Sequence, residues 1–192
     1  ETLAELGLPV VSLEAATSWI GRGVRALVER ALDRVGGATD LDRAVERFEA
    51  RYEGVVATRA SLFAGVEKGL LAMREAGLKL GVVTNKPRIF TEKLLKHLEV
   101  DTFFDAVVTG DDGLRRKPFG DMLAHAAHAM GVDISETLML GDSDNDVLAA
   151  RDAGCLVWCV PYGYNEGRPA ESLECDRLVG TVLEAARLLI VA

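Results

Sequence analysis

The first 60 residues place apolar side chains at the three- and four-residue spacing of amphipathic helices. Ser12 is predicted to cap a short helix that runs toward Trp19, and Asp40 is predicted to cap a longer one. Between them, apolar residues recur at helical spacing from Val24 to Val35, and two glycines at 36 and 37 end the pattern. Because no strand pattern occurs here, this part of the chain is predicted to be a small helical domain.

From residue 62 onward, short apolar runs alternate with helical patterns. The runs at 78–83, 106–109, 138–140 and 155–160 are predicted strands. Helical patterns cover 66–76, 122–130 and 181–190, and a further helix is predicted to begin at Pro87. Strands separated by helices indicate parallel βαβ units. We therefore expect a helical domain at 1–62 and an α/β domain with a doubly wound parallel sheet at 63–192.

Polar side chains follow three of these predicted strands, at the point where each strand ends. The groups are Thr84, Asn85 and Lys86 after the first strand, Lys117 beyond the second, and Asp142 with Asp146 after the next. Because the carboxyl ends of parallel strands lie on one edge of a sheet, these groups can converge on one crevice. A hydroxyl, amides, an ammonium group and a carboxylate-bound cation together suit a phosphoryl group.

An acidic cluster follows the strand at 138–140. Asp142 comes directly after Gly141, and Asp144 and Asp146 fall at the start of the next helix. Asp144 could simply cap that helix and Asp146 could complement its dipole, but neither role accounts for Asp142. Three carboxylates within five residues repel one another unless a cation or backbone donors offset them. The cluster therefore favours a Mg²⁺ site.

Each of the other polar groups also has a purely structural interpretation. Thr84 and Asn85 could form an ordinary turn before Pro87, and Lys117 could belong to a solvated basic loop. The segment Gly21-Arg22-Gly23 could be only a connection between helices. His97, His125 and His128 are interpreted as surface or packing residues rather than metal ligands.

Composition narrows the classes of partner. The 192 residues carry a net charge of −8 and the pI is about 5.0, which argues against nucleic acid or an anionic membrane surface as the main partner. No apolar run is long enough to span a bilayer, and no signal-peptide pattern is present. Cys155 and Cys159 lie about 13 Å apart along one predicted strand, too far for a disulfide. Free thiols favour a cytoplasmic location.

Together these motifs resemble the phosphatases of the haloacid dehalogenase (HAD) superfamily. Thr84 in VVTNKP is similar to the family's second motif, Lys117 in RRKP to the third, and Asp142 and Asp146 in GDSDND to the metal motif. Within the superfamily, the stretches WIGRG, LFAGVEKGLLAMREAGLKLGVVTNKP and YGYNEGRP most resemble the phosphoglycolate phosphatases. The sequence departs from that pattern at Ala64 and Gly120, where prolines are usual, and at Arg22, where asparagine is common.

The resemblance implies a Mg²⁺-dependent hydrolysis of a small phosphate ester, 2-phosphoglycolate, through an aspartyl-phosphate. Thr84, Asn85 and Lys117 would bind the phosphoryl group, and Asp142 and Asp146 the metal. Gly21, Arg22, Gly23 and Lys86 would bind the rest of the substrate, with the helical domain acting as a cap. The protein is expected to be a monomer or homodimer.

One family motif does not occur in these residues. The first motif, DxDGTLxDS, supplies the aspartate nucleophile and the aspartate acid/base, on the central strand of the family's sheet. We expect it to lie upstream of Glu1 and the 192 residues alone to be inactive. Three alternatives remain open: a phosphatase or phosphomutase for another small ester, a dehalogenase, or a non-catalytic binding protein. The acidic GDSDND motif weighs against the dehalogenase, because dehalogenases need no Mg²⁺.

Overall fold

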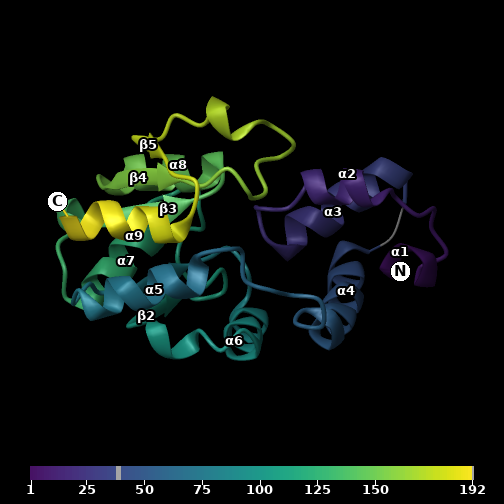
Figure 1. Cartoon of the computed structure of the whole chain (residues 1–192). Helices are drawn as coiled ribbons and strands as arrows, with labels where there is room; N and C mark the ends of the chain where they lie inside the picture. The colour runs from purple at the N-terminus through teal and green to yellow at the C-terminus, as the bar shows by residue number, and fades with distance from the viewer. Residues whose placement is uncertain (38–39, 192) are drawn as a thin grey trace.

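The computed structural model describes residues 1–37 and 40–191. Residues 38–39 and 192, which belong to the predicted helical and α/β domains, lie outside the described ranges. The helices before the first strand are α1 (Thr2–Glu5), α2 (Leu13–Ser18), α3 (Val24–Val35) and α4 (Leu41–Val55). They form a group of their own beside the strands (Figure 1).

Two predicted N-caps and one predicted stop explain where these helices begin and end. The Ser12 hydroxyl accepts a hydrogen bond from the Ala15 N–H at the start of α2, and the Asp40 carboxylate accepts one from Asp42 at the start of α4. Gly36 ends α3 with a left-handed φ of 67°. The buried faces of α3 and α4 form a small core around Val28, Leu32 and Ala44.

The strands pair in parallel, as expected for an α/β fold. β1 (Gly81–Val83) pairs with β2 (Ala106–Val108), with Gly81 opposite Ala106. β3 (Leu138–Gly141) pairs with β4 (Leu156–Cys159), and β4 pairs with β5 (Arg177–Leu178). Within the described ranges the strands form two sheets, ordered β1-β2 and β3-β4-β5. The α/β class with parallel strands is therefore confirmed.

Three local details differ from the sequence-based prediction. The first strand begins at Gly81 rather than at residue 78, because the Leu80 N–H donates to the Asp105 carboxylate instead of continuing the ladder. Pro87 caps the following helix instead of starting it. The two-residue strand β5 was not predicted, since two residues are too few to show an alternating pattern.

Helices cover the strands on two faces (Figure 1). They are α5 (Val66–Glu75), α6 (Arg88–His97), α7 (Asp121–Met130), α8 (Asp144–Ala153) and α9 (Val182–Val191). Three short 3₁₀ helices lie at Asp101–Phe103, Ile134–Glu136 and Ala170–Ser172. Along β3, Met139 packs into the core beside α8, whereas Leu140 packs into the core formed with α5 and α9. This alternation places one helical layer on each face.

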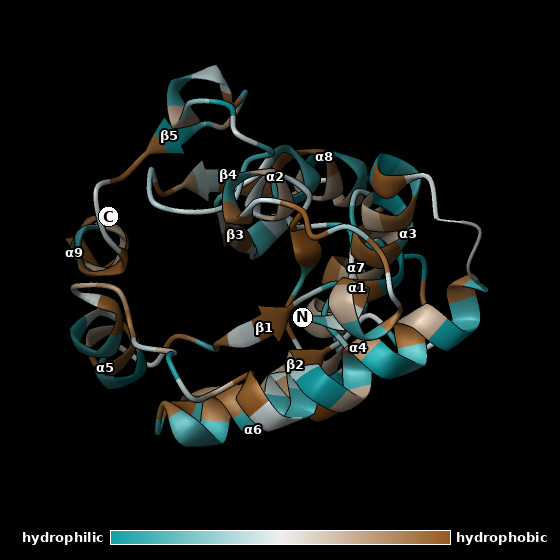
Figure 2. Cartoon of the chain, turned by 90° about the vertical axis from the view of Figure 1, so that its right-hand side faces the viewer, coloured by the Kyte–Doolittle hydropathy of each residue, from teal (hydrophilic) through white to brown (hydrophobic). Residues whose placement is uncertain are grey.

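The two sheets are apart at β1 and β3, as Figure 2 shows from the side. Val83 on β1 and the neighbouring Met139 and Leu140 on β3 are apolar. They line part of a pocket of about 720 Å³ that also receives polar residues from the strand ends. The carboxyl ends of β1 and β3 therefore open onto the same space.

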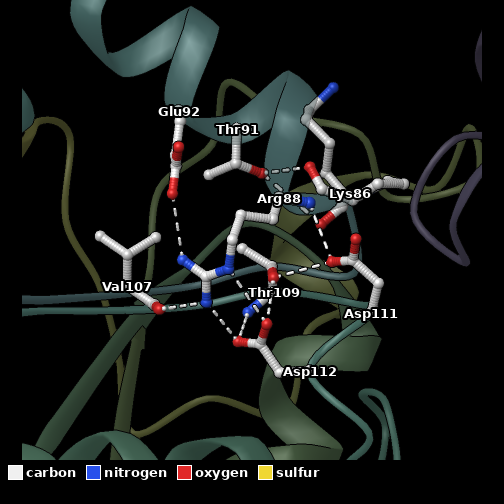
Figure 3. Close-up of polar contacts among 9 residues, drawn as sticks. Lys86, Arg88, Thr91, Glu92, Val107, Thr109, Asp111 and Asp112 are labelled. Carbon is white, nitrogen blue, oxygen red and sulfur yellow. Dashed lines mark hydrogen bonds and ion pairs between the residues drawn. The ribbon is translucent and has the colours of Figure 1, made fainter.

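An ion-pair cluster ties the segment after β1 to the segment after β2 (Figure 3). The Arg88 guanidinium lies 2.6 Å from the Asp112 carboxylate and donates to the Val107 carbonyl at 3.1 Å. The Arg88 N–H donates to Asp111 at 2.8 Å. These contacts hold together the segments that contain Lys86 and Lys117, so they help to position the candidate site.

Candidate active site

The polar groups predicted to converge do line one pocket. Its wall includes Thr84, Asn85, Lys86, Lys117, Asp142 and Asp146 from the strand ends. Gly21 and Gly23 of the helical domain also line it, together with Tyr52 of α4. The pocket therefore lies where the helical domain meets the carboxyl ends of β1 and β3.

Lys117 and Asp146 form a buried ion pair in this wall. The Lys117 ammonium lies 2.7 Å from Asp146 Oδ1, and the side chains are 11% and 5% exposed. The same ammonium donates to the Val83 carbonyl at the end of β1, at 2.8 Å. Burial opposes ionisation of Asp146, but the Lys117 charge and several hydrogen bonds keep the pKa of Asp146 below its usual value.

The second oxygen of Asp146 holds the turn between β3 and α8. Asp146 Oδ2 accepts hydrogen bonds from the N–H groups of Asp142 and Ser143, each at 3.1 Å, and from the Ser143 hydroxyl at 2.8 Å. Ser143 and Asp146 thus form a capping box at the start of α8. Gly141 permits this packing, because a Cβ there would lie 2.4 Å from the Asp146 Cβ. Ser143 is therefore the N-cap, not Asp144.

Among the described residues, Asp142 has no positively charged side chain within ion-pair distance, whereas Asp146 pairs with Lys117. Asp142 Oδ2 accepts a hydrogen bond from the Tyr164 N–H at 3.0 Å. Gly163 lies against it so closely that a Cβ there would be 2.0 Å from this oxygen. Burial raises the pKa of Asp142 to about 6, and the neighbouring Asp146 carboxylate adds to the increase. A cation bound at Asp142 would relieve both effects.

The donor set fits Mg²⁺, which commonly uses one or two protein carboxylates together with water and substrate phosphate oxygens. Asp142 offers an oxygen in the pocket wall, and Asp146 lies beside it. Within residues 1–37 and 40–191 no group of three or more His, Cys, Asp or Glu residues could hold a metal by itself. The histidines are exposed, consistent with their interpretation as surface residues.

Asn85 fastens the segment after β1 to two other parts of the wall. Its amide nitrogen donates to the carbonyls of Gly21 and Lys117, at 3.0 and 2.9 Å, and its amide oxygen accepts from the Lys117 N–H at 3.0 Å. Direct phosphate binding by this side chain, as expected from the sequence, would require these bonds to break. The Thr84 hydroxyl accepts from the Lys86 N–H at 3.2 Å and keeps its own proton for another acceptor.

Lys86 brings a second ammonium group to the wall. It donates to the Tyr52 hydroxyl of the helical domain and lies 4.8 Å from the centre of the Tyr52 ring. In the part of the chain that the structure describes, no carboxylate lies within ion-pair distance of Lys86. Among the described residues, Lys86 therefore differs from Lys117, which pairs with the Asp146 carboxylate.

Arg22 does not line the pocket. Its side chain is 54% exposed, and its Nε lies 3.0 Å from the Glu166 carboxylate of the loop after β4. Asp144 is also occupied elsewhere, because it pairs with Arg168 of the same loop. Sequence reasoning gave no role to Tyr52, Tyr164 or Glu166. The only signal for the latter two was the YGYNEGRP stretch that contributed to the family resemblance.

No helix in the described ranges is both long and apolar enough to cross a membrane. The chain also matches known proteins along most of its length. A model of the haloacid dehalogenase-like hydrolases matches residues 1–160. The chain is 41% identical to a phosphoglycolate phosphatase of Nitrosospira multiformis over 191 residues, which cover 97% of this chain and 84% of that protein. It is 40% identical to the corresponding protein of Thiobacillus denitrificans, with the same coverage of 97% and 84%.

The fold is also similar to that of solved structures. The crystal structure of a predicted phosphoglycolate phosphatase from Haemophilus somnus superimposes with a TM-score of 0.92 at 27% identity. That alignment covers 98% of this chain and 87% of the other. The match to the family model and the identity with two relatives agree with the site geometry, and the chain belongs to the haloacid dehalogenase-like hydrolases.

Proposed function

We propose that this protein is a Mg²⁺-dependent phosphomonoesterase that hydrolyses 2-phosphoglycolate to glycolate and phosphate. The observation that carries the proposal is the arrangement of the buried Lys117–Asp146 pair beside Asp142, in a pocket that also contains Thr84. The phosphoglycolate phosphatases with about 40% identity support the choice of substrate.

The pocket side chains and the bound metal would together offset the negative charge of the phosphoryl group. The Lys117 ammonium and the Thr84 hydroxyl would bind phosphoryl oxygens, and Asp142 would hold Mg²⁺, with Asp146 binding it directly or through water. Bound Mg²⁺ would supply Lewis-acid stabilisation of the charge on the phosphoryl oxygens. Because Asp146 fixes Lys117 at 2.7 Å, the ammonium is oriented before substrate arrives.

The other end of the substrate is a carboxylate, which needs a positively charged donor. Lys86 is suited to this role, because it lines the pocket and its ammonium contacts the neutral Tyr52 rather than a carboxylate. Gly21 and Gly23 line the same region and let the helical domain approach closely. Arg22 remains a second candidate donor if its side chain leaves Glu166 when substrate binds.

We assign the nucleophile and the acid/base to the family's first motif, on a segment that precedes residue 1. A strand of that segment would fit between β1 and β3, where the apolar residues Val83, Met139 and Leu140 line the pocket. A central strand of a parallel sheet, buried on both faces, needs such apolar neighbours. It would also bring its carboxyl end to Thr84 and Asp142.

We infer a cytoplasmic setting from the thiols and a monomer or homodimer as the working state. Cys155, Cys159 and Cys175 are all free, which suits a reducing compartment. Light scattering of the complete protein would give its oligomeric state.

The direct test is a phosphate-release assay of the complete protein. It should hydrolyse 2-phosphoglycolate with added Mg²⁺ and lose this activity in EDTA. Another small phosphate ester and a sugar phosphate serve as comparison substrates. If a comparison substrate is hydrolysed faster, the protein acts on that class of ester rather than on 2-phosphoglycolate. If no ester releases phosphate in a Mg²⁺-dependent reaction, the protein is better described as a non-catalytic binding protein.

A further inference from the structure

Glu166 joins the helical domain to the α/β domain through two arginines. Its Oε1 lies 3.0 Å from Arg22 Nε and 3.4 Å from each terminal nitrogen of Arg30. Arg22 lies in the loop before α3, and Arg30 lies on α3 itself. One carboxylate therefore meets two cations of the helical domain.

The loop that carries Glu166 is also attached to the site. We call residues 162–168 the bridging loop. Its Tyr164 N–H donates to the Asp142 carboxylate at 3.0 Å, and its Asn165 side chain accepts from the Asp144 N–H at 3.2 Å. Arg168 pairs with the Asp144 carboxylate. The bridging loop thus contacts the candidate metal ligand with one residue and the helical domain with another.

The Glu166 contact lies away from the connection between α4 and α5. In Figure 1 the chain passes from α4 to α5 in the lower part of the view, whereas the loop after β4 comes near α2 and α3 in the upper part. Contacts near the connection come from α4, where Tyr52 meets Lys86 and the Glu53 carbonyl accepts from Lys93 at 2.6 Å. Glu166 therefore attaches the helical domain at a place distant from the connection between α4 and α5.

The charges and the backbone at Glu166 both indicate a defined contact. The Arg22 and Arg30 side chains converge on one oxygen, and without the carboxylate their charges would repel. Glu166 and Arg30 are only 29% and 31% exposed, so solvent screens this contact less than a fully exposed one. Glu166 has a φ of 48°, which is uncommon for a non-glycine residue and persists where the surroundings hold it.

We propose that Glu166 is a positioning residue that latches the helical domain over the pocket through Arg22 and Arg30. Because the bridging loop also hydrogen-bonds Asp142, closing the domain and orienting this carboxylate are mechanically linked. The kinetic consequence rests on the proposed function, since it requires that the pocket be catalytic. The structural link between Glu166 and the Tyr164 N–H does not.

Two variants of the complete protein test the latch. Glu166→Gln removes the charge, and Glu166→Arg replaces attraction by repulsion. We expect kcat/KM to fall about 5- to 50-fold, with the larger loss for Glu166→Arg. The loss should be similar for 2-phosphoglycolate and for p-nitrophenyl phosphate, which has no carboxylate, because closure serves both. On p-nitrophenyl phosphate, which needs no donor to a carboxylate, the charge-swapped protein Glu166→Arg/Arg22→Glu/Arg30→Glu should recover to within about 3-fold of the parent.

Two controls and one structural measurement complete the test. Arg34→Glu changes an exposed charge on the same helix α3, and Glu171→Arg changes an exposed charge just after the bridging loop. Neither should change the kinetics. Hydrogen exchange at the Tyr164 amide should be about 5- to 10-fold faster in Glu166→Gln than in Glu171→Gln, and this measurement needs no catalytic activity. Circular dichroism checks that each variant is folded. If Glu166→Arg does not fold, the comparison of Glu166→Gln with the parent and the controls is sufficient for the test.

The outcomes separate the latch from its rivals. Unchanged Tyr164 exchange in Glu166→Gln overturns the link to Asp142. Unchanged kcat/KM in an active protein, or a folded charge-swapped protein with no recovery on p-nitrophenyl phosphate, overturns the latch. A loss confined to 2-phosphoglycolate also overturns it and shows instead that Glu166 orients Arg22 toward the substrate carboxylate. An inactive parent with faster Tyr164 exchange in Glu166→Gln would reject the proposed function but retain the coupling.

Discussion

The Lys117 ammonium lies 2.7 Å from the Asp146 carboxylate, and both side chains are nearly inaccessible to water. Removing one partner of a buried ion pair leaves an uncompensated charge and typically costs about 3–5 kcal/mol. We therefore expect Lys117→Met to lower the free energy of unfolding by about 3 kcal/mol at neutral pH. Adding Asp146→Asn should recover part of this loss. Urea denaturation measures both effects.

A matched control for this prediction exists on the surface. Lys79 pairs with Asp105 at 3.2 Å, but the Lys79 side chain is 53% exposed. Lys79→Met should cost under about 1 kcal/mol, because solvent screens the pair. Equal costs at the two lysines would contradict the idea that burial makes the Lys117–Asp146 pair expensive to break.

Asp142 and Asp144 should respond very differently to removal. Asp142 lines the pocket, whereas Asp144 pairs with Arg168 at the start of α8. In the complete protein, Asp142→Ala should weaken Mg²⁺ binding and Mg²⁺-dependent activity by about 100-fold or more, since even residues that only orient ligands are worth 10- to 100-fold. Asp144→Ala should change both little. Calorimetric titration with Mg²⁺ measures binding, and the reverse ranking of the two variants would sink the assignment.

The raised pKa of Asp142 makes a prediction about pH. Its pKa is about 6 in the folded protein against an ordinary 3.8, so between these values the folded state binds more protons than the unfolded state. Its contribution to stability is therefore present at low pH and lost as pH rises through about 6. In EDTA, Asp142→Asn should gain about 2–3 kcal/mol over the parent at neutral pH and little at pH near 4.

Urea unfolding at the two pH values measures this gain. Asp133→Asn is the control of opposite sign, because hydrogen bonds from Ser135 lower the pKa of Asp133. That contribution is present above the unfolded pKa and lost as pH falls through the folded value, so Asp133→Asn should destabilise the protein at neutral pH relative to low pH. A gain for Asp142→Asn that does not change with pH would refute the assigned pKa shift.

Lys86 and Arg22 are the two candidate donors to the substrate carboxylate. A charge-assisted contact is worth roughly 1.5–3 kcal/mol, or about 10- to 150-fold in kcat/KM. Lys86→Met should lose about this factor on 2-phosphoglycolate and little on p-nitrophenyl phosphate. If Arg22 binds the carboxylate, Arg22→Ala will show the same selectivity. Equal losses for Arg22→Ala on both substrates would instead agree with the role of Arg22 in the Glu166 latch. No loss on either substrate would show that Arg22 contributes to neither substrate binding nor the latch.

Residues 1–192 are expected to be inactive when produced alone. The reason is that the family's first motif, which carries the nucleophile, does not occur among them. Assaying residues 1–192 beside a chain extended upstream, with Mg²⁺ and 2-phosphoglycolate, checks this. The extended chain should also unfold at a higher temperature, because a strand between β1 and β3 would bury Val83 and Leu140. Robust turnover by residues 1–192 would place the nucleophile elsewhere.

The sequence by itself predicted those features that depend on neighbours along the chain. Ser12 and Asp40 were identifiable as helix caps, because a cap needs only a short polar side chain before an apolar helical pattern. The parallel α/β class followed from alternating periods of two and 3.6 residues. Thr84 could be selected because it comes directly after a predicted strand, and Asp142 because only Gly141 separates it from one.

Which of these side chains come into contact depends on the tertiary structure. The sequence predicts Asn85 as a phosphate ligand, and only the structure shows that its side chain hydrogen-bonds the Gly21 and Lys117 carbonyls. The sequence predicts Arg22 as a substrate ligand, and only the structure shows that it pairs with Glu166. Arg30 also pairs with Glu166, from 136 positions away along the chain. Periodicity and capping carry no information at that separation, because such contacts depend on how the helical domain packs against the strand ends rather than on local backbone preference.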